Sequence, residues 1–388
     1  MNMNLPDSEN RLSSEELKRY ARHFVLPEVG MEGQRRLKSS SALIVGVGGL
    51  GTIASTYLAA AGIGRLGLAD FDIVEHSNLH RQPLYSLSDV GQPKAEVAQR
   101  KFREINPNVD AIVLDTRLDS HNALDILQSY DVVLDCSDNL PTRYLVNDAC
   151  VILGKPDVYG AVFQFEGQAS VFCTRDGPCY RCLFPEPPPP ELVQSCAESG
   201  VLGMVPALMG SVQAVEAVKL ILGFGESLAG RLIMFDASKM DIRELKVERF
   251  ESCPVCGSNP TIHTLIDYQE FCGMKKEPDH EKSTSLDVSV SELKARMDKG
   301  EKLFLLDVRE PFEYDIAHLD ATLIPLNTLP SRMSQLDRDR EIVVYCHTGR
   351  RSASAAEYLR SNGFKRAKNL TGGIDEWARK VDTSMNRY

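Results

Sequence analysis

The chain has 388 residues with an apolar fraction ordinary for a soluble protein, a formal net charge of −10 and ten cysteines. This length predicts two or three domains, and the negative charge argues against nucleic-acid or acidic-membrane partners. No uninterrupted apolar run is long enough to cross a bilayer, and the first residues lack an apolar signal core, so we predict a cytoplasmic protein without membrane association.

Strand-like apolar runs alternate with helical patterns over residues 41–260, which predicts a doubly wound, mostly parallel α/β sheet. The runs are Ala42–Val47, Arg65–Ala69, Ala111–Leu114 and Asp131–Asp135. We place the first domain at residues 1–265 and a linker at 266–285, where "KKEPDHEKSTSLD" is charged and lacks large apolar residues. Residues 286–388 have the length and pattern of a second, small α/β domain.

A glycine motif follows the first strand. "GVGGLG", Gly46 to Gly51 and including Gly49, stands between the strand "ALIV" and an alanine-rich helical stretch. Asp70 comes about 20 residues later, at the end of the next strand, where an acidic residue binds a ribose. The pattern predicts a nucleotide site without distinguishing NAD from ATP, and a glycine-rich turn with no ligand is the alternative.

Basic residues downstream favour a triphosphate. "HSNLHRQ" and "GQPKAE" supply Asn78, Arg81 and Lys94, a set that a nicotinamide site does not need. Arginine and lysine can neutralise charge on the α-phosphate during adenylyl transfer, and Asp138 in "DCSDN" is placed to hold Mg²⁺ after its strand. Each residue alone could be a solvated side chain, but their joint spacing predicts ATP and Mg²⁺ as cofactors.

The nine cysteines before residue 286 fall into three groups. "CYRC" (Cys179, Cys182) and "CPVC" (Cys253, Cys256) predict a four-cysteine Zn²⁺ site, structural because no coordination position remains open. Cys196 follows the proline-rich "FPEPPPPELVQSC" and is either a mobile, exposed thiol or an ordinary loop cysteine. We expect the remaining cysteines before residue 286 to be small buried apolar residues, namely Cys136, Cys150, Cys173 and Cys272.

The second domain carries a further cysteine loop. A buried strand at Ile342–Tyr345 and a helix at Ser352–Leu359 flank Cys346, so loop N–H groups, a helix N-terminus, Arg350 and Arg351 should favour a thiolate there. A buried strand-end cysteine beside two solvated arginines is the alternative. Arg351 lies five positions after Cys346, one fewer than in a tyrosine-phosphatase loop, and this shorter ring suits a persulfide more than a phosphate.

The motifs together resemble known families. "GVGGLG", "DFDIVEHSNLHRQ", "GQPK", "DCSDN", "CYRC", "CAESGVLG" and "CPVC" are similar, in this order over residues 10–260, to the ubiquitin-activating-like adenylyltransferases of molybdopterin and thiamine synthesis. "LLDVREPFEYDIAHLDA", "YCHTGRRS" and "NLTGGIDEWA" resemble a rhodanese domain over residues 286–388. The whole chain resembles the fused adenylyltransferase–sulfurtransferase type.

This resemblance implies roles for particular residues. Asp70 would bind the ribose and Asp138 the Mg²⁺, and Arg22 matches an arginine that reaches the nucleotide of a partner subunit, which implies a homodimer. The residues that would bind the phosphates are Ser77, Asn78, Arg81 and Lys94.

The implied substrate is a small ubiquitin-like sulfur-carrier protein ending in Gly-Gly, whose carboxylate attacks the α-phosphate of ATP. A persulfide on Cys346, loaded by a donor such as a cysteine desulfurase, would attack the acyl-adenylate. Cys196 would then release the thiocarboxylate by forming a disulfide with Cys346. The alternatives are an NAD-dependent oxidoreductase and a non-catalytic scaffold for a ubiquitin-like protein.

Overall fold

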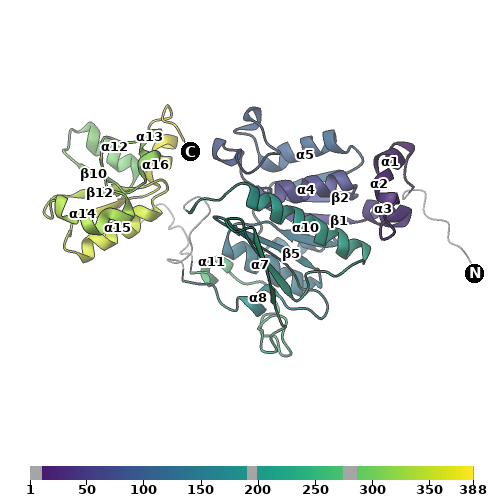
Figure 1. The fold of residues 1–388 in the computed structure, drawn as a ribbon. Coiled ribbons are helices and arrows are strands. Elements are labelled where there is room, and N and C mark those ends of the chain that lie inside the picture. Colours follow the sequence, from purple (N-terminus) through teal and green to yellow (C-terminus); the bar gives the residue numbers. More distant parts are fainter. Residues whose placement is uncertain (1–10, 190–198, 274–285, 388) are drawn as a thin grey trace, which may run out of the picture. The chain divides into compact units, whose positions relative to one another are not determined.

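The computed structural model of the chain describes residues 11–189, 199–273 and 286–387. The chain divides into two compact units, Met1–Lys276 and Glu277–Tyr388, each built around its own β-sheet (Figure 1). The domain boundaries at 265 and 286 stay a prediction. Of the expected linker, residues 274–285 lie outside the described residues, and Tyr268–Phe271 forms the short helix α11, which packs against α7 (Leu140–Leu153).

An eight-stranded sheet in the order β3-β2-β1-β4-β5-β6-β7-β8 forms the centre of the first unit. Its strands are β1 (Ser41–Val45), β2 (Arg65–Ala69), β3 (Asp110–Leu114), β4 (Val132–Asp135), β5 (Asp157–Phe163), β6 (Glu166–Phe172), β7 (Arg231–Asp236) and β8 (Asp241–Lys246). The strands from β3 to β5 pair in parallel, and β5 to β8 pair antiparallel. The predicted doubly wound, mostly parallel sheet is confirmed.

Side chains alternate between two cores on the two faces of this sheet. Ala42 and Ile44 of β1 belong to the core under α4 (Gly49–Ala61), whereas Leu43 and Val45 belong to the core under α7. This alternation follows from the two-residue period of a strand, and burial on both faces explains the continuous apolar runs in the sequence. The other described helices of the unit are α1 (Ser14–Arg19), α2 (Ala21–Phe24), α3 (Gly30–Ser39), α5 (Lys94–Ile105), α6 (Ala123–Leu127), α8 (Tyr180–Leu183) and α10 (Met204–Leu222).

Helix α10 is the one described helix that is long and apolar enough to cross a membrane, and half of that stretch is buried inside the unit. It packs along α4 and over β5 and β6 (Figure 1). Glu216 and Lys219 form an ion pair on it, and Gln213 donates hydrogen bonds of 2.8 Å to the carbonyls of Asp135 and Val158. These contacts are those of a core helix that ties the two central strands β4 and β5 together.

The second unit contains a five-stranded parallel sheet in the order β11-β10-β12-β13-β9. Its strands are β9 (Asp287–Val288), β10 (Phe304–Asp307), β11 (Thr322–Leu323), β12 (Ile342–Tyr345) and β13 (Ala367–Leu370). Its α-helices are α12 (Val290–Asp298), α13 (Pro311–Ile316), α14 (Leu329–Arg332), α15 (Arg350–Ser361) and α16 (Gly373–Lys380). Cores lie on both faces of the sheet, so β12 is buried on both sides, as its unbroken apolar run predicts.

Two carboxyl groups lie on neighbouring strands inside the first sheet, two residues apart in register. Asp135 of β4 and Asp157 of β5 are almost fully buried. Asp135 Oδ1 accepts hydrogen bonds from the amide and hydroxyl of Ser137, whereas Oδ1 of Asp157 has no hydrogen-bond partner among the described residues. Burial and the neighbouring Asp135 raise the pKa of Asp157 well above its usual value.

Asp157→Asn should therefore stabilise the chain at neutral and alkaline pH. Because the pKa of Asp157 is raised in the folded state, the unfolded chain ionises first, and stability is lost as the pH rises above about 4. An amide has no charge to bury, so we expect Tm at pH 8 to rise by about 2–4 °C, a gain that vanishes near pH 4. Thermal scans across pH test this, with the exposed Asp125→Asn as control; an unchanged pH profile would contradict it.

Candidate active sites

The glycine loop after β1 turns sharply into α4. Gly46 has φ of +90°, and a Cβ there would lie 3.0 Å from the carbonyl oxygen of Cys136, so the loop lies against the end of β4. Asp70 lies behind the loop and accepts hydrogen bonds from the amides of Val47 at 2.7 Å and Asp72 at 2.8 Å. Burial raises the pKa of this carboxyl, although the Lys94 charge and the two amides oppose the shift. The loop and Asp70 thus meet at the carboxyl edge of the sheet, as predicted.

The predicted phosphate-binding residues lie in the segment between β2 and α5. Lys94 starts α5, is buried and pairs with Asp72 at 3.0 Å. Arg81 donates a 2.6 Å hydrogen bond to the carbonyl of Ser77 and lies 2.9 Å from Nε2 of His80. This segment lies close to the glycine loop. A Cβ placed on Gly49 would be only 3.7 Å from the carbonyl oxygen of Arg81.

Asn78 and Ser77 differ in their surroundings. Asn78 is buried, and its Oδ1 accepts a 3.2 Å hydrogen bond from the amide of Glu75, which closes a short 3₁₀ turn. Ser77 is exposed, and its hydroxyl lies 3.5 Å from the Glu75 carboxylate. Phosphate binding by these two residues stays a prediction, and the structure gives Asn78 a role in the turn as well.

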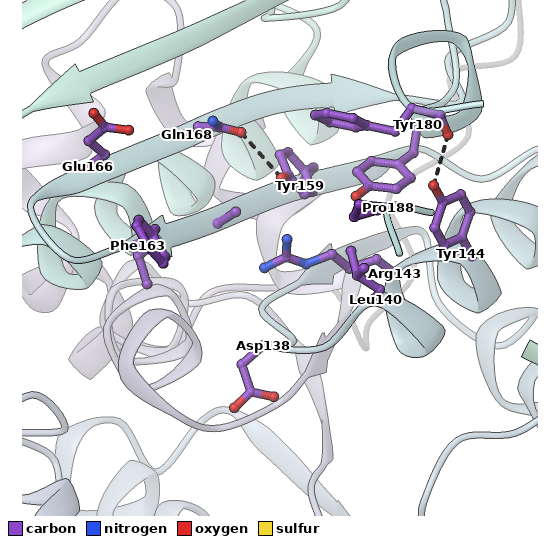
Figure 2. A pocket seen from close by; sticks show the side chains of 13 residues that line it. Asp138, Leu140, Arg143, Tyr144, Tyr159, Phe163, Glu166, Gln168, Tyr180 and Pro188 are labelled. Atoms are coloured by element: carbon purple, nitrogen blue, oxygen red, sulfur yellow. Dashed lines mark hydrogen bonds between the residues drawn. The ribbon is translucent and has the colours of Figure 1, made fainter. Parts of the chain in front are cut away.

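Asp138 is exposed at the carboxyl end of β4 and lines a cavity of about 260 Å³ (Figure 2). The cavity lies between the start of α7 and the hairpin of β5 and β6, and its other lining residues include Leu140, Arg143, Tyr144, Tyr159, Phe163, Glu166, Gln168, Tyr180 and Phe184. It therefore combines aromatic walls with a few polar groups. Binding of Mg²⁺ by Asp138 stays a prediction.

Arg143 was not singled out by sequence, yet it places a cation in this cavity. Figure 2 shows its guanidinium between Asp138 and the tyrosines. Its Nη2 donates a 3.2 Å hydrogen bond to the Ser137 carbonyl, whereas its buried Nε has no partner in the described part of the chain. Among the described residues, no carboxylate oxygen lies within ion-pairing distance of it. The sequence did offer one signal for Arg143. Asn139 is typical of a helix N-cap, and Arg143 comes one helical turn after it.

The four cysteines of the two C-x-x-C pairs come together. Their sulfurs all lie within 4.8 Å of one another, with 3.8 Å between Cys179 and Cys182, 3.5 Å between Cys179 and Cys253, and 3.3 Å between Cys182 and Cys256. Zn–S bonds of about 2.3 Å in a tetrahedron place sulfurs about 3.8 Å apart, so the four residues fit Zn²⁺. The amide of Phe250 donates to Cys182 Sγ at 3.3 Å, a contact typical of thiolate ligands.

Cys182→Ser or Cys256→Ser should lower metal content and thermal stability together. The cluster ties α8 to residues 253–256, far apart in the chain, and a structural metal contributes folding free energy directly. Losing several kcal/mol would lower Tm by roughly 10 °C in a domain of this size. Metal analysis by mass spectrometry and thermal scans test this, with Cys272→Ala as control; a wild-type chain purified without zinc would refute it.

Cys346 lies at the end of β12 and is almost fully buried. The amide of Gly349 donates to its Sγ at 3.1 Å, and the Ser352 hydroxyl lies 3.4 Å from the same atom. Gly349 has φ of +93° and is the N-cap of α15, so the loop turns its amide back toward the sulfur. One loop amide and the start of α15 thus lie against this sulfur, and a persulfide on Cys346 stays a prediction.

The two arginines after this loop differ from each other. Arg350 is exposed, but Arg351 forms two hydrogen bonds of 2.7 and 2.6 Å with the carboxylate of Glu313 on α13. The Glu313 carboxylate therefore largely compensates the charge of Arg351. Arg351 offers less charge to an anion at Cys346 than the sequence predicts. Burial lowers the pKa of the neighbouring His347, so this imidazole adds little charge at neutral pH.

Two further predicted residues are Arg22 and Cys196. Arg22 is exposed on α2, and its contact with the nucleotide of a partner subunit stays a prediction. Cys196 lies outside the described residues. The four cysteines expected to be ordinary, Cys136, Cys150, Cys173 and Cys272, are all buried, which confirms that expectation.

Comparison with known proteins decides the family. Residues 20–255 match the ThiF family, which is more than half of the chain. The chain belongs to the ThiF family. Residues 289–380 match the Rhodanese-like domain, so this member of the ThiF family carries a sulfurtransferase fold at its carboxyl end.

One relative matches nearly the whole chain, and two other known proteins match about two thirds of it. A Mycobacterium tuberculosis protein named "Probable adenylyltransferase/sulfurtransferase MoeZ" is 44% identical over 392 residues, covering 99% of this chain and 98% of the relative. A Thermus thermophilus "Sulfur carrier protein adenylyltransferase" is 55% identical over 270 residues, 68% of this chain and 100% of the relative. The solved structure of Escherichia coli MccB with ATP has a TM-score of 0.55 at 25% identity, covering 65% of this chain and 77% of that one.

The chain is thus an adenylyltransferase joined to a sulfurtransferase, and its family implies the use of ATP. These findings give no support to an NAD-dependent oxidoreductase or to a non-catalytic scaffold.

Proposed function

We propose that the chain adenylylates the C-terminal Gly-Gly carboxylate of a small ubiquitin-like sulfur-carrier protein and converts it to a thiocarboxylate with persulfide sulfur from Cys346. The observation that carries this proposal is the cavity beside Asp138, where the half-buried Arg143, without a carboxylate partner among the described residues, faces the space that Asp138 and the tyrosines line. A partly desolvated cation of this kind favours an anionic ligand.

The nucleotide end of the site is built from the glycine loop, Asp70, Arg81 and Lys94. The loop amides and the start of α4 are suited to bind phosphates. Asp70 lies at the same edge of the sheet, where it would accept a hydrogen bond from a ribose hydroxyl. Asp138 would hold Mg²⁺, which would neutralise charge on the triphosphate when bound. Arg81 would stabilise charge that grows on the α-phosphate as the carboxylate attacks.

The cavity suits the end of a flexible protein tail. Its volume of about 260 Å³ fits a few small residues, and Tyr159, Phe163 and Tyr180 offer apolar walls. Gln168 offers an amide, and Tyr159 lies 3.5 Å from it. Arg143 would hold the tail carboxylate beside the α-phosphate, a pre-organised geometry that lowers the entropy loss on reaching the transition state. Glycine at the tail end would avoid clashes with the aromatic rings.

The sulfur step balances in two displacements. The outer sulfur of the Cys346 persulfide attacks the acyl-adenylate, and AMP leaves with the electron pair of the broken C–O bond. The Cys196 thiolate then attacks Sγ of Cys346, which forms a disulfide and releases the carrier thiocarboxylate. An external thiol reduces the disulfide, and a sulfur donor such as a cysteine desulfurase reloads Cys346.

A homodimer forms part of this proposal. Exposed apolar side chains occur on α4 and α10, which pack together: Tyr57 is 58% exposed, Leu208 46% and Val215 56%. Val25 and Leu26, just beyond Arg22, are exposed as well. Such surfaces are typical of contacts between subunits, and a second copy there would cover them.

Two measurements test the function. The purified chain with ATP and a sulfur carrier ending in Gly-Gly should exchange pyrophosphate into ATP only when the carrier is present. Mass spectrometry of the carrier should then show one oxygen replaced by sulfur when a cysteine desulfurase and cysteine are added. A chain that binds the carrier without consuming ATP would instead be a scaffold, and the proposal would be wrong.

A further inference from the structure

An asparagine is buried within the sheet of the second unit. Asn369 lies on β13, at the start of "NLTGGIDEWA", and is 8% exposed. In register it lies beside Val344 of β12, two residues before Cys346, and beside Asp287 of β9. A buried amide lowers stability unless hydrogen bonds satisfy it, so the partners of this side chain indicate what it does.

Ser352 joins this amide to the sulfur of Cys346. Its side chain lies on the first turn of α15 and is fully buried. Its Oγ lies 2.7 Å from Oδ1 of Asn369, 3.4 Å from Sγ of Cys346 and 3.1 Å from the carbonyl oxygen of Gly349. A hydroxyl has one hydrogen to donate, so these three acceptors compete for it. The shortest contact assigns the hydrogen to Asn369.

Asp287 fixes which end of the Asn369 amide faces Ser352. Nδ2 of Asn369 donates a 3.4 Å hydrogen bond to Oδ1 of Asp287. A carboxylate oxygen only accepts, so the NH2 end of the amide faces Asp287 and the carbonyl end faces Ser352. Because the amide carbonyl also only accepts, the Ser352 hydroxyl is the donor between the two side chains.

This chain of contacts restricts the hydrogen bonds that reach the sulfur. While Ser352 donates to Asn369, the amide of Gly349 remains as a donor to Cys346 Sγ at 3.1 Å. If the hydroxyl turns toward a thiolate at Cys346, Oδ1 of Asn369 loses its donor in a buried position, and this loss opposes the turn. In a persulfide the charge lies on the outer sulfur, so Sγ competes less for the hydroxyl.

We propose that Asn369, oriented by Asp287, is a positioning residue that holds the Ser352 hydroxyl away from the Cys346 sulfur and so limits the reactivity of this sulfur before it is loaded. This inference rests on the proposed function, in which Cys346 carries the persulfide. A less reactive thiol is also less open to oxidation between turnovers.

Asn369→Leu tests the inference, because leucine has a similar volume and cannot accept a hydrogen bond. The Ser352 hydroxyl is then able to donate to the sulfur, so we expect iodoacetamide to alkylate Cys346 about fivefold faster at neutral pH, the effect of one hydrogen bond. The substitution leaves every charge in the unit unchanged, since both side chains are neutral. Mass spectrometry of the Cys346 peptide measures the rate separately from the other cysteines.

The pH profile and a second background separate this effect from a looser fold. The alkylation profile should move to lower pH in Asn369→Leu, because a hydrogen bond to the sulfur favours its anion, whereas a merely more accessible Cys346 would react faster without such a move. In a Ser352→Ala background, Asn369→Leu should change the rate less than about twofold. Asn362→Leu is the matched control, because it removes an amide at the far end of α15 and should leave the rate unchanged.

Asp287→Ala tests the orientation of the amide without a change in the core, because Asp287 is only half-buried. The amide of Asn369 can then turn its NH2 end to Ser352, so alkylation should become about twofold faster or more, and this increase should vanish in the Ser352→Ala background. An unchanged rate in either folded variant, or an increase that persists without the Ser352 hydroxyl, would overturn the inference. Thiocarboxylate formation by Cys346→Ala would instead overturn the proposed function and leave these rates as they are.

Discussion

Cys346→Ala should abolish thiocarboxylate formation and leave carrier-dependent pyrophosphate exchange unchanged. The proposed function places the persulfide on Cys346, and the amide of Gly349, in the loop that starts α15, faces this sulfur at 3.1 Å. Alanine offers no atom to carry the persulfide, whereas adenylate formation depends on residues of the other unit. We expect the rate with cysteine and a desulfurase to fall by on the order of 10³ or more. Mass spectrometry of the carrier C-terminus measures it.

Added sulfide provides the control for this variant. Hydrosulfide can attack the acyl-adenylate directly, so millimolar sulfide should restore thiocarboxylate in Cys346→Ala. Cys272→Ala, at a buried cysteine outside both sites, should behave like the wild-type chain. Wild-type rates in Cys346→Ala with the physiological donor and no sulfide would mean that another group carries the sulfur.

Local patterns predicted most of the fold because they depend on near neighbours in the chain. Arg65–Ala69 and Ile342–Tyr345 are strands with the predicted bounds, since an apolar run buried on both faces leaves a clear signal. The C-x-x-C pairs likewise predicted the cluster, because two cysteines at this spacing can bind the same metal ion.

The features that the sequence did not reveal depend on distant residues. Glu313 neutralises Arg351 from 38 positions away, and no local pattern relates the two. Arg143 becomes notable only when β5, β6 and α8 enclose it, with no carboxylate among the described residues to pair with it. Helix α11 was assigned to the linker because its four residues are too few to show a period, yet Tyr268 reaches the buried Asp148.

Arg81 is the cation with the greatest freedom to meet a nucleotide. Lys94 is buried against Asp72, and Arg143 lies in the cavity beside Asp138, whereas the guanidinium of Arg81 contacts only the Ser77 carbonyl and His80 among the described residues. Burial and the charge of Arg81 lower the pKa of His80, so this imidazole is neutral beside it and does not compete for an anion.

Arg81→Ala should therefore slow adenylate formation far more than it weakens carrier binding. The charge on the α-phosphate grows in the transition state, so a cation placed there contributes about 2.7–4 kcal/mol, or a factor of about 10²–10³ in rate. Carrier-dependent ATP–pyrophosphate exchange measures this rate, and anisotropy of labelled carrier measures binding, which should change less than about twofold. Arg100→Ala is the matched control, because Arg100 of α5 pairs with Asp89 and has no expected contact with the nucleotide. Exchange at the wild-type rate in Arg81→Ala would remove Arg81 from the catalytic site and leave Lys94 as the cation that acts on the α-phosphate.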